Sequence, residues 1–352
     1  MSAGPEETRR ALLAWYDENR RDLPWRRTRD PYAIWVSEIM LQQTRVETVV
    51  PYYERFLERF PTPADLAAAP EDEVLASWSG LGYYRRARLL HAGVREVVER
   101  YGGRVPEDAS ARRSLPGVGR YTAGAIGSIA FGREEALVDG NVARVLSRLH
   151  GIDTPLGRAE TERALWSRAE ALVRGARPGD LNQALMELGA RVCLPRGARC
   201  DECPLRSWCG ARHDGRVEEL PVPRPKKAPK RVKLGAVVAL RGGERVGLVK
   251  SSGGLFGGLY GVPTAEGHGR DAARRALKDA SMSARLDREP SGRLEHVLSH
   301  RRLDVEVWRA VGASLEPDER RRLVPLGELD GLGTSTLTRR ILAVATDRAR
   351  TG

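Results

Sequence analysis

The segment at residues 115–126 reads LPGVGRYTAGAI, and after a short connector residues 138–142 read VDGNV. Pro116, Gly117 and Gly119 are each unfavourable inside a helix. The start of the segment therefore predicts a tight turn, and the small side chains that follow favour a helix. The expected unit is a helix, a glycine hairpin and a second helix, and the rest of the chain is interpreted from it.

The glycine hairpin is a candidate phosphate site. The amides of Gly117, Val118 and Gly119 are expected to lack helical partners and to lie at a helix N-terminus. Backbone N–H groups in that position bind phosphate readily. An ordinary turn between two helices is the alternative.

The hairpin and the Asp139-Gly-Asn141 sequence after it resemble the helix-hairpin-helix DNA glycosylases of base-excision repair, and the MutY adenine glycosylases in particular. The resemblance is dense from Trp15 to Cys209 and looser in the C-terminal third. It implies a mostly α catalytic region with a 4Fe-4S cluster loop, followed by an α+β Nudix-like domain. The implied parts are a glycosylase region (1–217), a linker (218–232) and a mismatch-recognition domain (233–352). Within the first part, residues 29–135 would form the hairpin module, and the N-terminal segment with residues 136–217 the cluster module.

Composition limits the function classes. Two domains are the natural expectation for 352 residues. The 59 Lys and Arg residues against 47 Asp and Glu give a net charge of +12, which favours a polyanionic partner. The N-terminus has no apolar signal-peptide region, and no apolar run approaches membrane-spanning length, so a cytoplasmic protein without a membrane partner is expected. No lysine occurs before Lys226.

Glu38 is the first candidate catalytic residue. Residues 31–44 are expected to form a helix whose apolar side chains cover nearly its whole circumference. A carboxyl group there should have a raised pKa and could act as a general acid. A salt bridge from Glu38 to a nearby arginine is the alternative. Residues 37–44 (SEIMLQQT) resemble the MutY segment that carries the catalytic glutamate.

Asp139 is the second candidate. It could simply cap the helix expected at residues 140–149. The resemblance implies instead that Asp139 is the second catalytic carboxylate, that Asn141 orients it, and that Tyr121 supports the two acids.

The resemblance also implies residues that line the base pocket or enter the duplex beside the extruded base. These are Trp25, Arg26, Gln43, Tyr83 and Gln183. The amide of Gln183 can both donate and accept, as reading an adenine edge requires. For Tyr83 a core aromatic is the competing interpretation, and for Gln183 a solvated polar face.

The four cysteines, Cys193, Cys200, Cys203 and Cys209, are close together in a chain without other cysteines. Such a group indicates a metal site rather than disulfides, and a tetrahedral zinc site is one candidate. The spacing resembles the 4Fe-4S loop of MutY and endonuclease III. Arg196 and Arg199 in this loop are suited to DNA phosphates.

The C-terminal third predicts an α+β domain. Strands are expected at 233–240, 245–250, 294–299 and 303–311, and helices at 270–284 and 334–348. Residues 274–280 (RRALKDA) lack most of the carboxylates that a Nudix hydrolase needs, which excludes nucleotide hydrolysis here. The resemblance implies that Ser299 and His300 recognise 8-oxoguanine, with Leu298 in place of the family's phenylalanine.

The predicted reaction is hydrolysis of the N-glycosidic bond of adenine mispaired with 8-oxoguanine or guanine in double-stranded DNA, by a monomer. An endonuclease III-like lyase is a rival, but those relatives have a lysine where this chain has Tyr121. Lyase chemistry needs such an amine, so a monofunctional enzyme is expected. A thymine-mismatch glycosylase and a non-catalytic iron-sulfur DNA-binding protein are two further rivals.

Overall fold

The computed structural model describes residues 4–224, 228–253, 256–298 and 300–347. The chain divides into two compact units. The first unit comprises Met1–Ala67 and Ala92–Lys226, and the second comprises Ala68–His91 and Lys227–Gly352. None of the helices in the described part is both long and apolar enough to span a bilayer.

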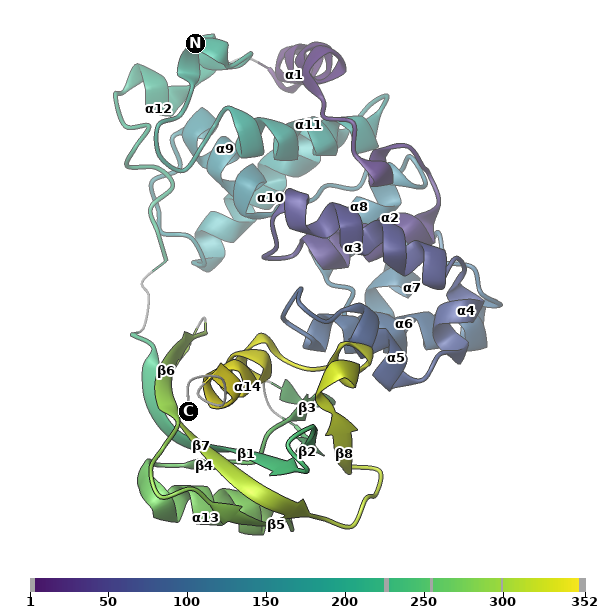
Figure 1. Cartoon of the computed structure of the whole chain (residues 1–352). Coiled ribbons are helices and arrows are strands. Elements are labelled where there is room, and N and C mark those ends of the chain that lie inside the picture. The colour runs from purple at the N-terminus through teal and green to yellow at the C-terminus, as the bar shows by residue number, and fades with distance from the viewer. Residues whose placement is uncertain (1–3, 225–227, 254–255, 299, 348–352) are drawn as a thin grey trace. The chain divides into compact units, whose positions relative to one another are not determined.

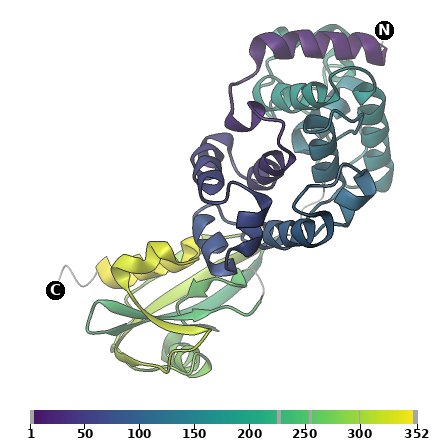
Figure 2. The same ribbon diagram turned by 90° about the vertical axis from the view of Figure 1, so that its right-hand side faces the viewer.

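The first unit is built from helices (Figures 1 and 2). Their bounds follow the chain: α1 (Pro5–Asn19), η1 (Pro24–Arg26), α2 (Pro31–Leu41), α3 (Val46–Arg59), α4 (Pro63–Ala68), α6 (Arg85–Tyr101), α7 (Ala109–Ser114), α8 (Arg120–Ile129), α9 (Gly140–His150), α10 (Ala159–Val173), α11 (Pro178–Arg191), η2 (Cys200–Glu202), η3 (Arg206–Trp208) and α12 (Gly210–His213). Helix α4 ends, and α6 begins, within the segment assigned to the second unit.

Helix α2 is buried all round, as the sequence predicts. The Asp30 side chain caps it by accepting from the amides of Tyr32 (3.0 Å) and Ala33 (3.3 Å). Every residue from 32 to 40 is buried. The helix ends at Leu41, earlier than the predicted residue 44, because the backbone at Gln43 turns to a positive φ of 58°.

The glycine hairpin joins α7 to α8. Gly117 has a φ of +77°, which favours glycine, and the amide of Val118 donates to the carbonyl of Leu115 at 3.1 Å. The expectation of a partnerless amide is therefore wrong for Val118, because the turn itself uses that N–H group. Gly124 in α8 lets the connector after the helix approach closely, since a Cβ there would lie 2.1 Å from the carbonyl oxygen of Ala136.

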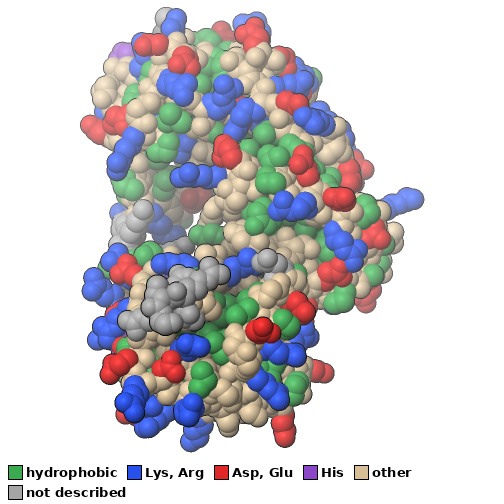
Figure 3. Space-filling view, in the orientation of Figure 1, with side chains coloured by type: hydrophobic (Ala, Val, Ile, Leu, Met, Phe, Trp, Pro, Cys, Tyr) green, Lys and Arg blue, Asp and Glu red, His purple; other side chains and the backbone are tan. Residues whose placement is uncertain are grey.

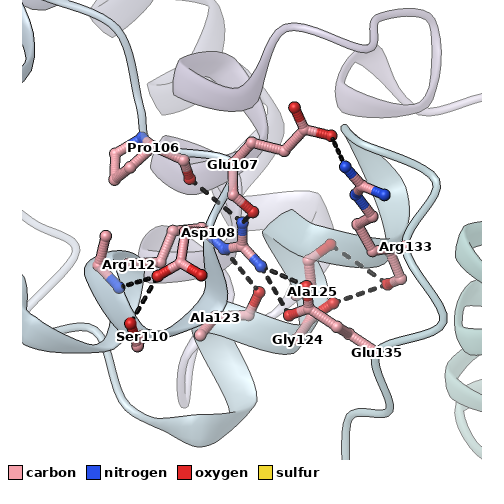
Figure 4. A network of polar contacts seen from close by, with 12 residues as sticks. Pro106, Glu107, Asp108, Ser110, Arg112, Ala123, Gly124, Ala125, Arg133 and Glu135 are labelled. Atoms are coloured by element: carbon pink, nitrogen blue, oxygen red, sulfur yellow. Dashed lines mark hydrogen bonds and ion pairs between the residues drawn. The ribbon is translucent and has the colours of Figure 1, made fainter.

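A buried arginine ties the same connector to the hairpin (Figure 4). Arg112 is fully buried, and its guanidinium donates to Glu135 (2.6 Å to Oε2) and to the carbonyls of Pro106 (3.1 Å), Glu107 and Ala123 (3.3 Å). The connector leads directly to Asp139, so this network fixes one side of the candidate site.

The second unit contains a mixed sheet. Within the described residues eight strands form one sheet with the central order β3-β2-β1-β7-β5, while β4, β6 and β8 pair with β1, β7 and β2. The bounds are β1 (Lys230–Arg241), β2 (Arg245–Lys250), β3 (Tyr260–Gly261), β4 (Thr264–Glu266), β5 (Ser283–Leu286), β6 (Gly292–Val297), β7 (Arg301–Ser314) and β8 (Arg321–Pro325). The unit's helices are α5 (Glu71–Ser77), α13 (Gly269–Asp279), η5 (Leu326–Gly331) and α14 (Thr336–Asp347).

Alternating residues of β1 pack into two cores, one on each face of the sheet. Val238 packs with Leu337 and Ile341 of α14, whereas Val237 packs with Ala276 of α13. The two helices therefore cover opposite faces, as Figure 1 shows. The predicted hairpin at Gly242-Gly243 is confirmed by the pairing of β1 with β2.

The predicted helix at residues 270–284 is too long. Helix α13 ends at Asp279, Ser281 has a φ of +50°, and Ser283 already belongs to β5. No Gly or Pro marks this end, and the chain turns because β5 pairs with β7.

We expect Arg112→Ala to lower the free energy of unfolding by about 3–5 kcal/mol, because Glu135 and three main-chain carbonyls lose a donor from a fully buried side chain. Chemical denaturation measures this change. Asp17→Asn, which breaks an exposed pair with Arg177, is the control and should cost less than about 1 kcal/mol. Equal stability of the two variants would contradict the prediction.

Candidate active site

One cavity in the first unit brings together eight of the residues singled out from the sequence. It has a volume of about 490 Å³. The eight residues that line it are Trp25, Arg26, Glu38, Gln43, Tyr121, Asp139, Asn141 and Gln183. They come from segments far apart in the sequence, as expected for a site built by the fold.

Glu38 belongs to the buried helix α2, and its side chain lines the cavity. Its side chain is almost fully buried, and the hydroxyl of Tyr121 donates to its Oε2 at 2.6 Å. Burial raises the pKa of Glu38 to about 7, while the Tyr121 hydrogen bond acts in the opposite direction. Glu38 is therefore partly protonated at neutral pH, in keeping with the property predicted from its helix.

Asp139 both caps α9 and lines the cavity. Its Oδ1 accepts from the amide of Val142 at 2.7 Å, and its Oδ2 accepts from Nδ2 of Asn141 at 3.0 Å. Burial raises the pKa of Asp139, and these donors oppose the rise. Capping and a cavity position are thus compatible, although the sequence presents them as alternatives.

Arg144, which the sequence analysis did not single out, fixes the orientation of Asn141. Its Nη2 donates to Oδ1 of Asn141 at 2.8 Å, so the amide N–H₂ group is left to face Asp139. Its Nε donates to the carbonyl of Cys193 at 2.7 Å. The only sequence signal for Arg144 is its place one helical turn after Asn141.

Glu187 was also missed. It lies one helical turn after Gln183 in α11, and its buried carboxylate accepts from Arg21 (2.8 Å) and Arg26 (2.9 Å). Burial raises its pKa, but these two arginines outweigh burial and bring the pKa to about 2. The network anchors Arg26 at the cavity wall.

Trp25 and Tyr83, two of the residues predicted to line the base pocket or enter the duplex, differ in how far they are buried. Trp25 is buried and packs edge-on against Tyr53 with ring centroids 5.4 Å apart. Tyr83 belongs to the second unit and is 48% exposed in a turn with a positive φ of 50°. The core-aromatic interpretation therefore fails for Tyr83.

The four cysteines are free, partly buried thiols on the segment that follows α11. Arg148 lies among them: its Nη1 donates to Sγ of Cys193 at 3.3 Å, and its carbonyl accepts from Cys209 at 3.4 Å. Burial, together with the charges of the other three thiols, raises the pKa of Cys203 to about 12. In the part of the chain that the structure describes, no three His, Cys, Asp or Glu side chains are arranged to hold a single metal ion.

Arg196 and Arg199 are exposed beside these cysteines, and Arg199 pairs with Glu202 at 3.6 Å. In the C-terminal turn, Ser299 lies outside the described residues and His300 is exposed. The partly buried side chain of Leu298 packs against the core of the sheet.

Charge alone does not locate a nucleic-acid surface. Figure 3 shows Lys and Arg side chains scattered over the visible face and interspersed with Asp and Glu. The net charge of +12 therefore supports a polyanionic partner in general, and the cavity is the more specific guide.

Two family models match the chain. The HhH-GPD superfamily base excision DNA repair model matches residues 36–171, and the NUDIX domain model matches residues 236–344. Adenine DNA glycosylase of Rattus norvegicus is 41% identical over 358 residues, covering 85% of this chain and 69% of the rat protein. That of Homo sapiens is 52% identical over 221 residues, covering 60% of this chain but 40% of the human protein.

Two solved structures resemble the first part of the chain. A thermostable thymine-DNA glycosylase is 34% identical with a TM-score of 0.54, covering 60% of this chain and 97% of that one. Endonuclease III in a non-covalent DNA complex has a TM-score of 0.50 at 24% identity, covering 62% of this chain and 100% of that one, and supports the fold alone.

We predict that Tyr121→Phe raises the pKa of Glu38 above its value of about 7. The variant removes a donor that stabilises the carboxylate, so the neutral acid persists to higher pH. Carboxyl ¹³C NMR of labelled glutamate, with Glu38→Gln to assign the signal, measures the shift. A pKa that stays or falls would show that the hydrogen bond does not stabilise the ionised form.

Proposed function

This chain belongs to the MutY-type adenine DNA glycosylases of base-excision repair, hydrolases that act on N-glycosyl bonds, and we propose that its substrate is adenine mispaired with 8-oxoguanine or guanine in double-stranded DNA. The observation that carries the proposal is the shared cavity of Glu38 and Asp139. The two acids differ in environment, which suits them to different roles.

In the proposed mechanism the adenine leaves the stack and enters the cavity, since its glycosidic bond cannot be reached inside a duplex. Gln183 and the Arg26–Glu187 pair line the pocket and offer donors and acceptors for the purine edge. Trp25 gives the pocket an apolar wall.

Glu38 then donates its proton to an imidazole-ring nitrogen of adenine, which makes the base a better leaving group. The bond between the base nitrogen and the sugar breaks with both electrons going to the base. Asp139, oriented by Asn141, stabilises the positive charge left on the deoxyribose or adds to it transiently. Water then adds its oxygen to the cationic sugar carbon, and the proton that it releases restores the acid form of Glu38, so the products are an abasic sugar and free adenine.

The chain is proposed to be monofunctional. A lyase step needs an amine that forms a Schiff base with the sugar. The sequence has no lysine before Lys226, and Tyr121 instead donates to Glu38. This sequence feature supports hydrolysis by water alone.

The proposed DNA contacts lie outside the cavity. Gly117 and Gly119 offer hairpin amides, and Arg196 and Arg199 offer exposed guanidinium groups, to phosphates of the duplex. The protein is proposed to bind DNA as a monomer in the cytoplasm.

The proposed reader of the base opposite adenine is the turn of the second unit that contains Ser299 and His300. Tyr83 is proposed to wedge into the duplex beside the extruded base, as its 48% exposure allows.

The proposed cofactor is a 4Fe-4S cluster held by Cys193, Cys200, Cys203 and Cys209. The thiols are mutually close enough to perturb one another's pKa, which supports a shared site. Four cysteine thiolates are also the ligand set that such a cluster takes. When bound, the cluster would supply a rigid centre for the loop that carries Arg196 and Arg199.

We expect the protein to excise adenine opposite 8-oxoguanine and opposite guanine, and Glu38→Gln to lose that activity while keeping its affinity for DNA. The variant preserves the size of the side chain but cannot donate the proton. Alkaline cleavage of abasic sites in a labelled duplex measures excision, and equilibrium binding to the same duplex measures affinity.

A duplex with thymine opposite guanine is the control substrate and should stay intact. Borohydride should trap no covalent protein–DNA adduct. Intact adenine duplexes would favour the non-catalytic binder, and trapping in high yield would favour a lyase.

For the cofactor, we expect about four iron atoms and no stoichiometric zinc per chain, with visible absorbance that disappears in Cys203→Ser. Elemental analysis and absorption spectroscopy of anaerobically purified protein measure both. One zinc per chain with no iron would rule out the cluster.

A further inference from the structure

The turn that carries Tyr83 belongs to the same compact unit as the C-terminal sheet. Gly82 (φ +73°) and Tyr83 (φ +50°) both adopt left-handed backbone conformations, which a non-glycine residue rarely does. The indole N–H of Trp78 donates to the carbonyl of Gly82 at 3.2 Å. A turn with this conformation persists only where its surroundings hold it.

Hydrogen bonds of Tyr84, the next residue, keep the turn in this conformation. Its side chain is buried, and its hydroxyl accepts from the amide of Gly80 at 3.2 Å and donates to the main-chain carbonyl of Thr334 at 2.9 Å. The hydroxyl of Ser79 donates to the same carbonyl at 3.2 Å. One carbonyl near the C-terminus therefore anchors both ends of the turn.

The Thr334 carbonyl is itself held in place. Thr334 is buried and bridges to Tyr260 of β3, whose amide donates to the carbonyl of Gly333 at 2.9 Å. Directly after it, Ser335 caps α14 by accepting from the amide of Thr338 at 3.0 Å. The position of this carbonyl is therefore tied to that of strand β3 and of the capped helix α14.

Helix α14 also contacts the strand before the proposed recognition turn. Nη1 of Arg340 donates to the carbonyl of Glu295 in β6 at 3.0 Å. Strand β6 leads into that turn, which is closed by the amide of Leu298 donating to the carbonyl of Arg301 at 2.8 Å. Helix α14 therefore contacts strand β6, which leads into the proposed recognition turn, and begins two residues after Thr334, whose carbonyl holds the Tyr83 turn.

We propose that the Tyr84–Thr334 hydrogen bond couples recognition of the base opposite adenine to the wedging of Tyr83, which makes Tyr84 a positioning residue for opposite-base discrimination. This inference rests on the proposed function, in which Tyr83 and His300 both contact the mispair. A displacement of the recognition turn reaches Thr334 through α14, and Tyr84 transmits it to the Tyr83 turn. Tyr84 itself touches neither the base nor the sugar.

The test compares Tyr84→Phe with the unaltered protein in single-turnover excision of adenine opposite 8-oxoguanine and opposite guanine. The variant keeps the ring but loses the hydroxyl. We expect the ratio of the two rates to shrink by roughly three- to tenfold, the effect of one lost hydrogen bond. Ser79→Ala, which removes the second donor to the same carbonyl, should shift the ratio in the same direction.

Tyr32→Phe is the matched control. Tyr32 is also buried, and its hydroxyl donates to a main-chain carbonyl, that of Phe60, at 2.9 Å in the first unit. It should lower thermal stability about as much as Tyr84→Phe and leave the ratio unchanged. A purely structural role for Tyr84 would make the two variants alike.

A double-mutant cycle tests the coupling directly. If Tyr84 acts by coupling the recognition turn to Tyr83, Tyr84→Phe should change the ratio of the two excision rates little in a His300→Ala background. In that background the proposed contact of His300 with the opposite base is already lost. An unchanged ratio in Tyr84→Phe, an equal change in Tyr32→Phe, or full additivity in the cycle would overturn the inference alone. An unaltered protein that excises adenine from neither mispair would overturn the proposed function and this inference together.

Discussion

The burial of one carboxyl group, Glu38, is the constraint on which the catalytic unit depends. Glu38 belongs to an apolar helix, and its burial raises its pKa to about 7. Asp139 lines the same cavity and accepts hydrogen bonds that favour its charged form. Burial raises both pKa values, but hydrogen bonds from Val142 and Asn141 oppose the rise at Asp139. At Glu38, by contrast, a hydrogen bond from Tyr121 opposes the rise and the charge of Asp139 adds to it. One fold can thereby hold an acid that donates a proton beside one that stabilises positive charge.

Buried arginines supply many of the side-chain hydrogen bonds that connect distant segments of this unit. Arg112 and Arg148 are almost completely buried, and each donates to several carbonyl oxygens that connect different segments. A guanidinium stays charged when buried and has five donors, so it can satisfy such sites where a lysine cannot. The same bias leaves the region before Lys226 without a side-chain amine, so composition serves both the structure and the proposed chemistry.

Local patterns predict what depends on neighbouring residues. The burial of α2, the glycine hairpin and the hairpin at Gly242-Gly243 all follow from side chains within a few positions of one another. Pairings across long sequence separations do not: Glu187 lies 166 residues from Arg21, and only the packing of the first unit brings them together. The predicted end of α13 is wrong for the same reason, since pairing of β5 with β7 ends the helix. Resemblance to a family supplied the cavity residues that periodicity could not.

The second unit matches the NUDIX domain model, although its helix α13 has few of the carboxylates that a Nudix hydrolase needs. The buried Glu306 accepts from the amide of Gly269 at the start of α13 and from the indole of Trp308 (3.0 Å). Glu306 therefore connects the sheet to the start of α13. The unit has an apolar core on each face of the sheet and a capped helix, α14, and these features suit a rigid support. Function resides in sites rather than in folds, so one fold can support different sites. In this unit the fold supports the turn that carries Tyr83. The position of that turn depends on how closely α14 and Thr334 are fixed.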